Sequence, residues 1–106
     1  MEDCVFCKII KKEINSDIIY EDDDFVIFKD INPKASTHVL IVPKKHIKSI
    51  NQLTESDKKL MQEIIFLAKH IAKELNVSEG YKLQFNVEKK GGQEVPHIHL
   101  HLLSDL

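Results

Sequence analysis

The clearest pattern in the chain is an alternation of polar and apolar residues close to its C-terminal end. Successive side chains of a strand point to opposite faces, so a period of two predicts a strand over residues 98–103 with one apolar face. That face belongs in the core, and the opposite face carries a row of imidazoles. The alternating residues are His97, Ile98, His99, Leu100, His101 and Leu102.

Other segments also have strand character. Residues 18–20 and 25–28 are apolar and flank the acidic run 21–24, which predicts a hairpin with a polar turn. Residues 38–42 are almost entirely apolar, which predicts a central strand buried on both faces. Residues 81–87 alternate cleanly and predict a further strand.

One long helix is predicted between these strands. Thr54 followed by Asp57 is typical of an N-cap with a capping box, and Asn76 and Gly80 are expected to end the helix. Between them, apolar residues at helical spacing form a stripe that should lie on a sheet. These residues are Leu60, Ile64, Leu67, Ala68, Ile71 and Leu75. Strands and helix together predict an α+β domain with a mainly antiparallel sheet.

The composition is that of an ordinary globular protein. The chain has 106 residues, of which 42% are hydrophobic and 30% charged, so we expect a single domain over 1–106. A net charge of −2 with interleaved signs argues against binding nucleic acid through charge. Because no apolar run approaches the roughly 20 residues of a membrane helix and no signal peptide is visible, we expect a cytoplasmic protein without membrane contact.

Cys4 and Cys7 form a C-x-x-C pair. In a reducing compartment such a pair indicates a metal site or a redox motif more often than a structural disulfide. A thioredoxin-like motif would follow a strand and begin a long helix, whereas this pair lies at the extreme N-terminus. The position therefore disfavours redox chemistry.

The histidine row allows several interpretations. It could be a polar, exposed sheet face, although ionisable groups clustered beside a loop usually mark a site. It could bind a metal, or one imidazole could act as a nucleophile while its neighbours orient it. The loop segment Gly91-Gly92-Gln93 favours phosphate chemistry, because its backbone N–H groups could point at an anion.

Residues 97–103 match the pattern in which histidine alternates with apolar residues in the histidine-triad (HIT) family. Further segments resemble its Hint branch, the nucleoside phosphoramidases also known as protein kinase C-interacting proteins. They are residues 8–10, 21–23, 30–33, 37–38, 43–47, 86 and 91–93. The resemblance covers essentially the whole chain. It implies a HIT-like fold with a mainly antiparallel five-stranded sheet, one long helix and one short helix.

The resemblance also implies an activity, the hydrolysis of purine nucleoside 5′-phosphoramidates by a homodimer whose two sheets join. His99 would attack the α-phosphorus and form a nucleotidyl-histidine intermediate, with no metal needed for catalysis. The backbone at His97 would hold the tautomer of His99. His101 and His38 would support phosphate binding.

The substrate contacts implied by the resemblance fall into two groups. Asp30 would hold the ribose hydroxyls, and Ile31 with Phe6, Ile9 and Phe28 would wall the purine, although plain core packing explains the last three equally well. The remaining contacts, mostly expected on the phosphate side, are Asn86, Gly92, Gln93, Glu94 and Leu100.

A structural zinc site is the other implication. Some relatives combine the C-x-x-C pair with two histidines, and the matching positions here are Cys4, Cys7, His46 and His97. This closed Cys₂His₂ set suits structural zinc. It also argues against a catalytic metal on the triad, because His97 would already be a ligand.

The chain departs from the Hint pattern at three places. Glu94 replaces a frequent serine, Pro96 replaces an aromatic residue, and the longer Trp-bearing tail of some relatives is absent after Leu106. A carboxylate at position 94 would repel a phosphate unless it turns outward. We therefore expect slower turnover or a preference for cationic leaving amines.

Three other functions remain open from the sequence. The chain could hydrolyse dinucleoside polyphosphates, although the Hint-like segments disfavour this. It could be a non-catalytic nucleotide-binding or adaptor protein. It could also be a catalytic metalloprotein that uses the histidine row as ligands.

Overall fold

The strand patterns come together in one antiparallel sheet with the strand order β1-β2-β3-β5-β4. The computed structural model describes residues 3–106. The elements are α1 (Val5–Ile10), β1 (Ile18–Glu21), β2 (Phe25–Lys29), β3 (Thr37–Pro43), α2 (Lys58–Glu74), β4 (Lys82–Gln84) and β5 (Leu100–Ser104). Short 3₁₀ turns lie at Ile50–Gln52, Glu55–Asp57 and Lys89–Gly91. This architecture confirms the predicted α+β class, with one long and one short helix.

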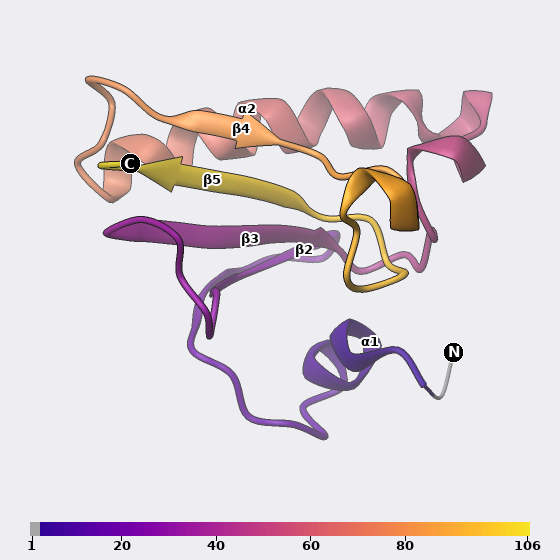
Figure 1. The fold of residues 1–106 in the computed structure, drawn as a ribbon. Coiled ribbons are helices and arrows are strands. Elements are labelled where there is room, and N and C mark those ends of the chain that lie inside the picture. The colour runs from indigo at the N-terminus through magenta and orange to yellow at the C-terminus, as the bar shows by residue number, and fades with distance from the viewer. Residues whose placement is uncertain (1–2) are drawn as a thin grey trace.

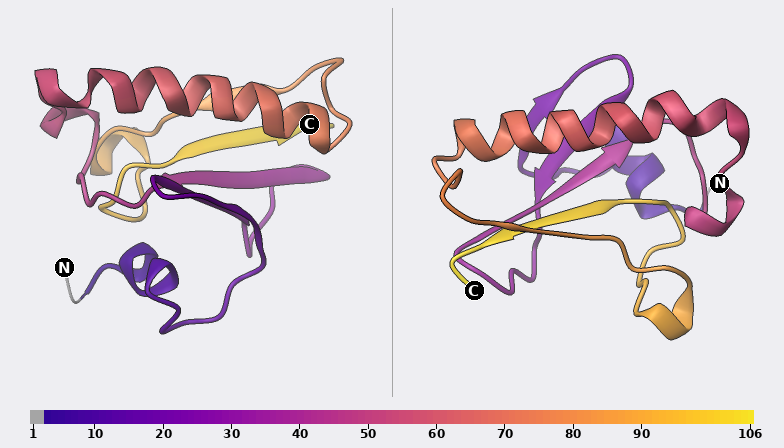
Figure 2. Two further views of the ribbon diagram at one scale, coloured as in Figure 1. Left: turned by 180° about the vertical axis from the view of Figure 1, so that it is seen from behind. Right: turned by 90° about the horizontal axis from the view of Figure 1, so that it is seen from above.

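The sheet lies between the two helices, with α2 along one face and α1 on the other (Figures 1 and 2). On the α2 side, the buried stripe of the helix packs on alternate residues of the strands. The core on that side includes Phe25, Ile27, Val39, Ile41, Ile64, Ala68, Ile71, Leu100 and Leu102. The core on the α1 side consists of Cys4, Phe6, Cys7, Ile9, Val26, Phe28, Leu40 and Val42.

The predicted hairpin and the predicted central strand are both confirmed. β1 and β2 pair as neighbours around the acidic turn. β3 pairs with β2 on one side and β5 on the other, and its residues from His38 to Pro43 are all buried. Because helices cover both faces at this strand, apolar side chains on both faces are favourable.

The start of α2 follows the predicted capping box with one difference. Thr54 N–H donates to Oδ2 of Asp57 at 2.9 Å, and the capping box forms. It encloses a 3₁₀ turn at Glu55–Asp57, so the α-helix itself begins at Lys58. The helix ends at Glu74, and Asn76 follows with a φ of 60°, a left-handed conformation that asparagine tolerates.

Two strands differ from their predicted bounds. β4 spans Lys82–Gln84 instead of 81–87, because it is an edge strand with one partner and the chain beyond it turns into the glycine loop. β5 spans Leu100–Ser104 instead of 98–103. Before β5, Ile98 N–H donates to the carbonyl of Ile47 at 2.6 Å, outside the sheet ladder. The alternation of polar and apolar residues does not show where pairing with a neighbouring strand begins or ends.

The helices of the described segment 3–106 offer no candidate for a membrane span.

Candidate active site

A pocket lies on the α1 side of the sheet, between α1, the ends of β2 and β5, and the glycine loop. Most of the predicted catalytic and substrate residues line it. They are Phe6, Ile9, Phe28, Asp30, Ile31, His38, Asn86, Gly92, Glu94, His99 and His101. The structure therefore brings together residues that lie far apart in the sequence.

His99 is held by the backbone two residues before it. Its Nδ1 lies 2.8 Å from the carbonyl oxygen of His97. A carbonyl can only accept, so Nδ1 carries the proton and Nε2 keeps its lone pair. Burial lowers the pKa of His99 and keeps the ring neutral near pH 7. The hydrogen bond to the His97 carbonyl and the charges of Asp30 and Glu94 oppose this effect by raising the same pKa.

The tautomer of His101 is set by a chain of hydrogen bonds. Lys34 N–H donates to Nδ1 of His38 at 3.1 Å, so neutral His38 is protonated at Nε2. This Nε2 lies 2.9 Å from Nδ1 of His101 and 3.4 Å from Oδ2 of Asp30. Nδ1 of His101 therefore accepts, and its Nε2–H is left as a donor. Burial lowers the pKa of both rings, to about 4 for His101.

The side chain of His97 does not line this pocket. Its Nε2 donates to the carbonyl of Pro43 at 2.8 Å, which leaves the lone pair on Nδ1. That nitrogen lies 3.2 Å from Sγ of Cys4 and 3.1 Å from Nδ1 of His46. The ring of His97 thus belongs to the cysteine cluster, and its contribution to the pocket is its carbonyl.

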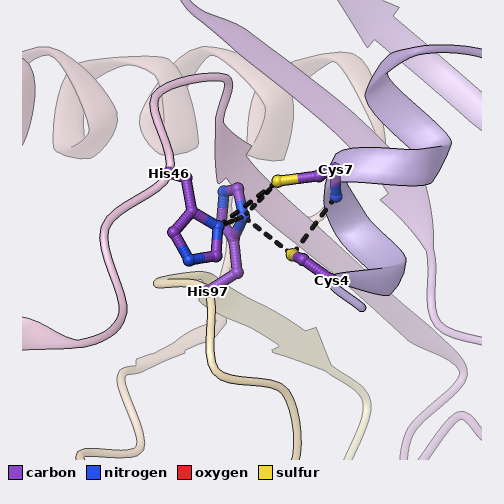
Figure 3. Close-up of side chains that lie close together, drawn as sticks. All are labelled: Cys4, Cys7, His46 and His97. Carbon is purple, nitrogen blue, oxygen red and sulfur yellow. Dashed lines mark hydrogen bonds between the residues drawn. The ribbon is translucent and has the colours of Figure 1, made fainter. Parts of the chain in front are cut away.

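Four side chains point at one another (Figure 3), those of Cys4, Cys7, His46 and His97. They come from the N-terminal end of α1, the loop after β3 and the segment before β5. Sγ of Cys7 lies 3.3 Å from Nδ1 of His46 and 3.6 Å from Nδ1 of His97. Tetrahedral zinc, with bonds of about 2.0–2.3 Å, places neighbouring donors about 3.3–3.8 Å apart. The four donor atoms therefore fit a single metal ion.

The second ring nitrogen of His97 supports the same conclusion. Metal-bound histidines usually donate their other N–H to a carbonyl, as His97 does to Pro43. Without an ion, burial and the hydrogen bond to Cys4 raise the pKa of Cys7 to about 11. A bound cation would stabilise the thiolate instead. The set is therefore a candidate metal-binding cluster, called the metal cluster below.

Phe6 connects the cluster to the pocket. It lies between the two cysteines in α1, and its ring packs edge-on against His97 at 5.9 Å and His99 at 5.0 Å between centroids. It also lines the pocket. Phe6 therefore takes part in core packing and walls the pocket, so the two interpretations of this residue are compatible.

The glycine loop is held by its own hydrogen bonds. The N–H groups of Gly91 and Gly92 donate to the carbonyls of Glu88 and Lys89, and Gln93 N–H also donates to Glu88. These groups therefore have backbone acceptors within the loop, and the expectation that they bind an anion stays a prediction. Gly92 has a φ of 86°, which favours glycine.

Two predicted substrate residues lie outside the pocket lining. The Gln93 amide accepts from Glu88 N–H and donates to the carbonyls of Lys48 and Val95, so it fastens the loop. Leu100 is 1% exposed and packs in the core on the α2 side. It alternates with His99 and His101, so a contact of its side chain with the substrate is excluded.

The pocket also has lining residues that the sequence analysis missed. They include Ser16, Lys34, Leu40, Gln84 and Val95. Lys34 contributes its backbone N–H to His38 as well, and Pro43 contributes its carbonyl to His97. Backbone roles of this kind leave no signal in residue type.

Comparisons with known proteins show the family to which this chain belongs. A family model described as "Scavenger mRNA decapping enzyme C-term binding" matches residues 3–106. Protein HitA of Neisseria gonorrhoeae is 41% identical over 103 residues, which cover 97% of this chain and 96% of that protein. A purine nucleoside phosphoramidase of Escherichia coli is 44% identical over 103 residues, covering 96% of this chain and 87% of that protein.

Solved structures show the same similarity. A HIT family hydrolase from Legionella pneumophila has a TM-score of 0.94 at 50% identity, covering 96% of this chain and 92% of that one. A HIT family hydrolase from Clostridium thermocellum has a TM-score of 0.95 at 44% identity, covering 100% and 93%. Fold and histidine row define a HIT-type α+β protein. The chain belongs to the histidine-triad family.

The buried histidines predict a dependence of stability on pH. The pKa of His101 is about 4 in the folded protein, against 6.5 ordinarily, so between these values the unfolded chain binds more protons. The free energy of unfolding should therefore fall as the pH is lowered from 6.5 toward 4. His101→Gln should flatten this dependence, and denaturant titrations at several pH values measure it.

His70→Gln is the matched control, because His70 is an exposed histidine of α2. It should keep the wild-type dependence on pH. Equal slopes in His101→Gln and the wild type would contradict a half-buried, neutral His101.

Proposed function

We propose that this protein hydrolyses purine nucleoside 5′-phosphoramidates through a covalent nucleotidyl-histidine intermediate on His99. The observation that carries the proposal is the bond from Nδ1 of His99 to the His97 carbonyl, which leaves Nε2 as a neutral nucleophile in the pocket. The similarity to a purine nucleoside phosphoramidase supports the choice of substrate.

From the residues that line the pocket, we assign it a nucleoside end and a phosphate end. Phe6, Ile9 and Phe28 are buried apolar residues on the α1 side, and Ile31 is 88% exposed, so a purine could pack between them. Asp30 lies beside them, and its carboxylate suits the ribose hydroxyls. His101 lies next to His99, with 4.9 Å between ring centroids, and Asn86 also lines the pocket, so the phosphate would bind at this end.

The proposed reaction has two balanced steps. Nε2 of His99 forms a bond to the α-phosphorus while the P–N bond breaks, and the leaving nitrogen takes up one proton from the solvent to depart as an amine. Water then forms a P–O bond while the bond to Nε2 breaks, releasing AMP and one proton. Nε2–H of His101 would stabilise the charge on the phosphate oxygens during both steps.

This geometry disfavours a catalytic metal on the histidine row. Nδ1 of His97 faces the cysteines, whereas Nδ1 of His101 accepts from His38. The rings therefore do not offer their free nitrogens to one point. Asp30, His38 and His101 do place ligand-type atoms close together, but the hydrogen-bond chain accounts for that arrangement.

The proposal predicts the behaviour of His99→Ala. The variant should lose turnover of a fluorogenic adenosine phosphoramidate by at least about a thousandfold, because no other group can form the covalent bond. Its affinity for AMP should stay within about tenfold, since the other contacts remain. Steady-state kinetics and calorimetry measure the two quantities.

His70→Ala, outside the pocket, serves as the control and should retain wild-type turnover. Turnover by His99→Ala at a wild-type rate would refute the covalent mechanism. Tight AMP binding by a wild-type protein without turnover would instead indicate a non-catalytic nucleotide-binding protein.

We also propose that the metal cluster binds structural zinc through Cys4, Cys7, His46 and His97. Bound there, zinc would supply no chemistry to the substrate and would fix α1 against the segment before β5. These four residues belong to three separate parts of the chain, which a bound ion would hold together. Both cysteines are free thiols, which is compatible with the cytoplasmic location that we expect.

The zinc proposal predicts that His46→Ala lowers the zinc content of the purified protein well below one per chain. At zinc about a thousandfold above its dissociation constant, the lost stabilisation is about 4 kcal/mol. Elemental analysis and thermal unfolding with and without chelator measure these effects. His70→Ala is the control, and stoichiometric zinc in both variants would contradict the assignment of His46.

A homodimer completes the proposal. β4 is an edge strand, and the apolar side chains of Tyr81, Leu83 and Phe85 along it are only partly buried. Open edges are usually covered. Pairing of β4 with a second copy would bury these side chains and join the two sheets.

Sedimentation equilibrium tests this assembly. At micromolar concentration we expect twice the monomer mass of 12.3 kDa. A single species at the monomer mass across that range would rule out the dimer.

A further inference from the structure

Glu94 is an acidic side chain inside the pocket that no group within residues 3–106 neutralises. It lines the pocket together with His99, and no ion pair or side-chain hydrogen bond engages it in the described chain. Its backbone position is well defined, because the preceding residue Gln93 fastens the loop at both ends. A carboxylate held at a phosphate site without a partner costs binding energy unless the ligand supplies a cation.

The position of Glu94 relative to the two ends of the pocket decides which part of a ligand it faces. The nucleoside end is formed by α1 residues with Asp30 and Ile31. Glu94 follows Gly92 in the loop at the other end, where it lines the pocket together with His99. An α-phosphate held at His99 has two substituents, the ribose and the leaving group. Since the ribose is directed toward Asp30, Glu94 faces the leaving group.

Charge within the pocket supports the same assignment. The other ionised side chains that line it are Lys29, Asp30 and Lys34. Lys29 pairs with Asp17 at 3.6 Å, and Lys34 lies next to His38, to which its backbone N–H donates. Asp30 lies 3.4 Å from His38, which is neutral, and in the proposed binding mode Asp30 holds the ribose hydroxyls. Glu94 is therefore the acidic group that remains for a ligand cation.

We propose that Glu94 is a specificity-determining residue that selects leaving groups carrying a positive charge near the scissile P–N bond, such as amines with a second ammonium group. This inference rests on the proposed nucleotide hydrolase function. Glu94 is exposed, so the selectivity is that of a surface ion pair and weakens with salt. The expected preference is about 2- to 5-fold at low ionic strength.

A pair of slowly cleaved ligands tests the selectivity by binding alone. The 3-aminopropyl and the propyl esters of AMP differ by one ammonium group, and calorimetry gives the dissociation constant of each. The wild type should bind the aminopropyl ester about 2- to 5-fold more tightly, with the ratio falling toward one as salt is raised. Glu94→Gln should reduce the ratio to about one, and Glu94→Lys should reverse it.

Glu79→Gln is the matched control, because it removes an exposed carboxylate from the turn after α2, outside the pocket. Its ratio should equal that of the wild type. The same comparison is then made as the ratio of kcat/KM for the corresponding cationic and neutral phosphoramidates. A wild-type ratio of one, or an unchanged ratio in Glu94→Gln, overturns the proposal.

The two proposals fail in different ways. A ratio of dissociation constants that depends on Glu94, without turnover of either phosphoramidate, would retain the cation selectivity and remove the hydrolase function. Turnover that depends on His99 but has the same kcat/KM for both leaving groups would retain the hydrolase function and remove the cation selectivity.

Discussion

The carbonyl oxygen of His97 accepts a hydrogen bond from Nδ1 of His99, and the chemistry proposed for the pocket depends on that bond. A neutral imidazole can carry its proton on either nitrogen, and only one tautomer leaves Nε2 free to attack phosphorus. The carbonyl favours that tautomer without introducing a charge. Burial lowers the pKa of His99 and maintains the neutral ring. Position and protonation state are thus set by two separate causes, the backbone and the core.

The carbonyl can play this role because His97 is itself anchored. Its ring donates to Pro43 at the end of β3 and faces the cysteines of α1, and it is 0% exposed. One residue therefore belongs to the metal cluster through its side chain and to the pocket through its backbone. Phe6 forms a second connection, because it contacts the rings of both His97 and His99. Loss of order in the metal cluster would therefore disturb the position of His99.

Hydrophobic periodicity predicted the hairpin, β3, α2 and the α+β class, since burial on one or two faces determines which residues are apolar. It did not predict that β5 begins only at Leu100, because the partner of Ile98 is the loop carbonyl of Ile47. Family resemblance indicated the histidines and the role of the His97 backbone for the tautomer of His99. It did not indicate the N–H of Lys34 or the carbonyl of Pro43, on which the tautomers of His38 and His97 depend. Gln93 shows the same limit, since an amide can bind a ligand or fasten its own loop, and only the fold distinguishes these roles.

The state of the His99 ring tests the central claim most directly. In protein with ¹⁵N-labelled histidine, long-range ¹H–¹⁵N correlation spectra at pH 7 distinguish the two neutral tautomers from the imidazolium. The account predicts that His99 carries its proton on Nδ1, with Nε2 unprotonated. A proton on Nε2 alone, or on both nitrogens, would contradict it.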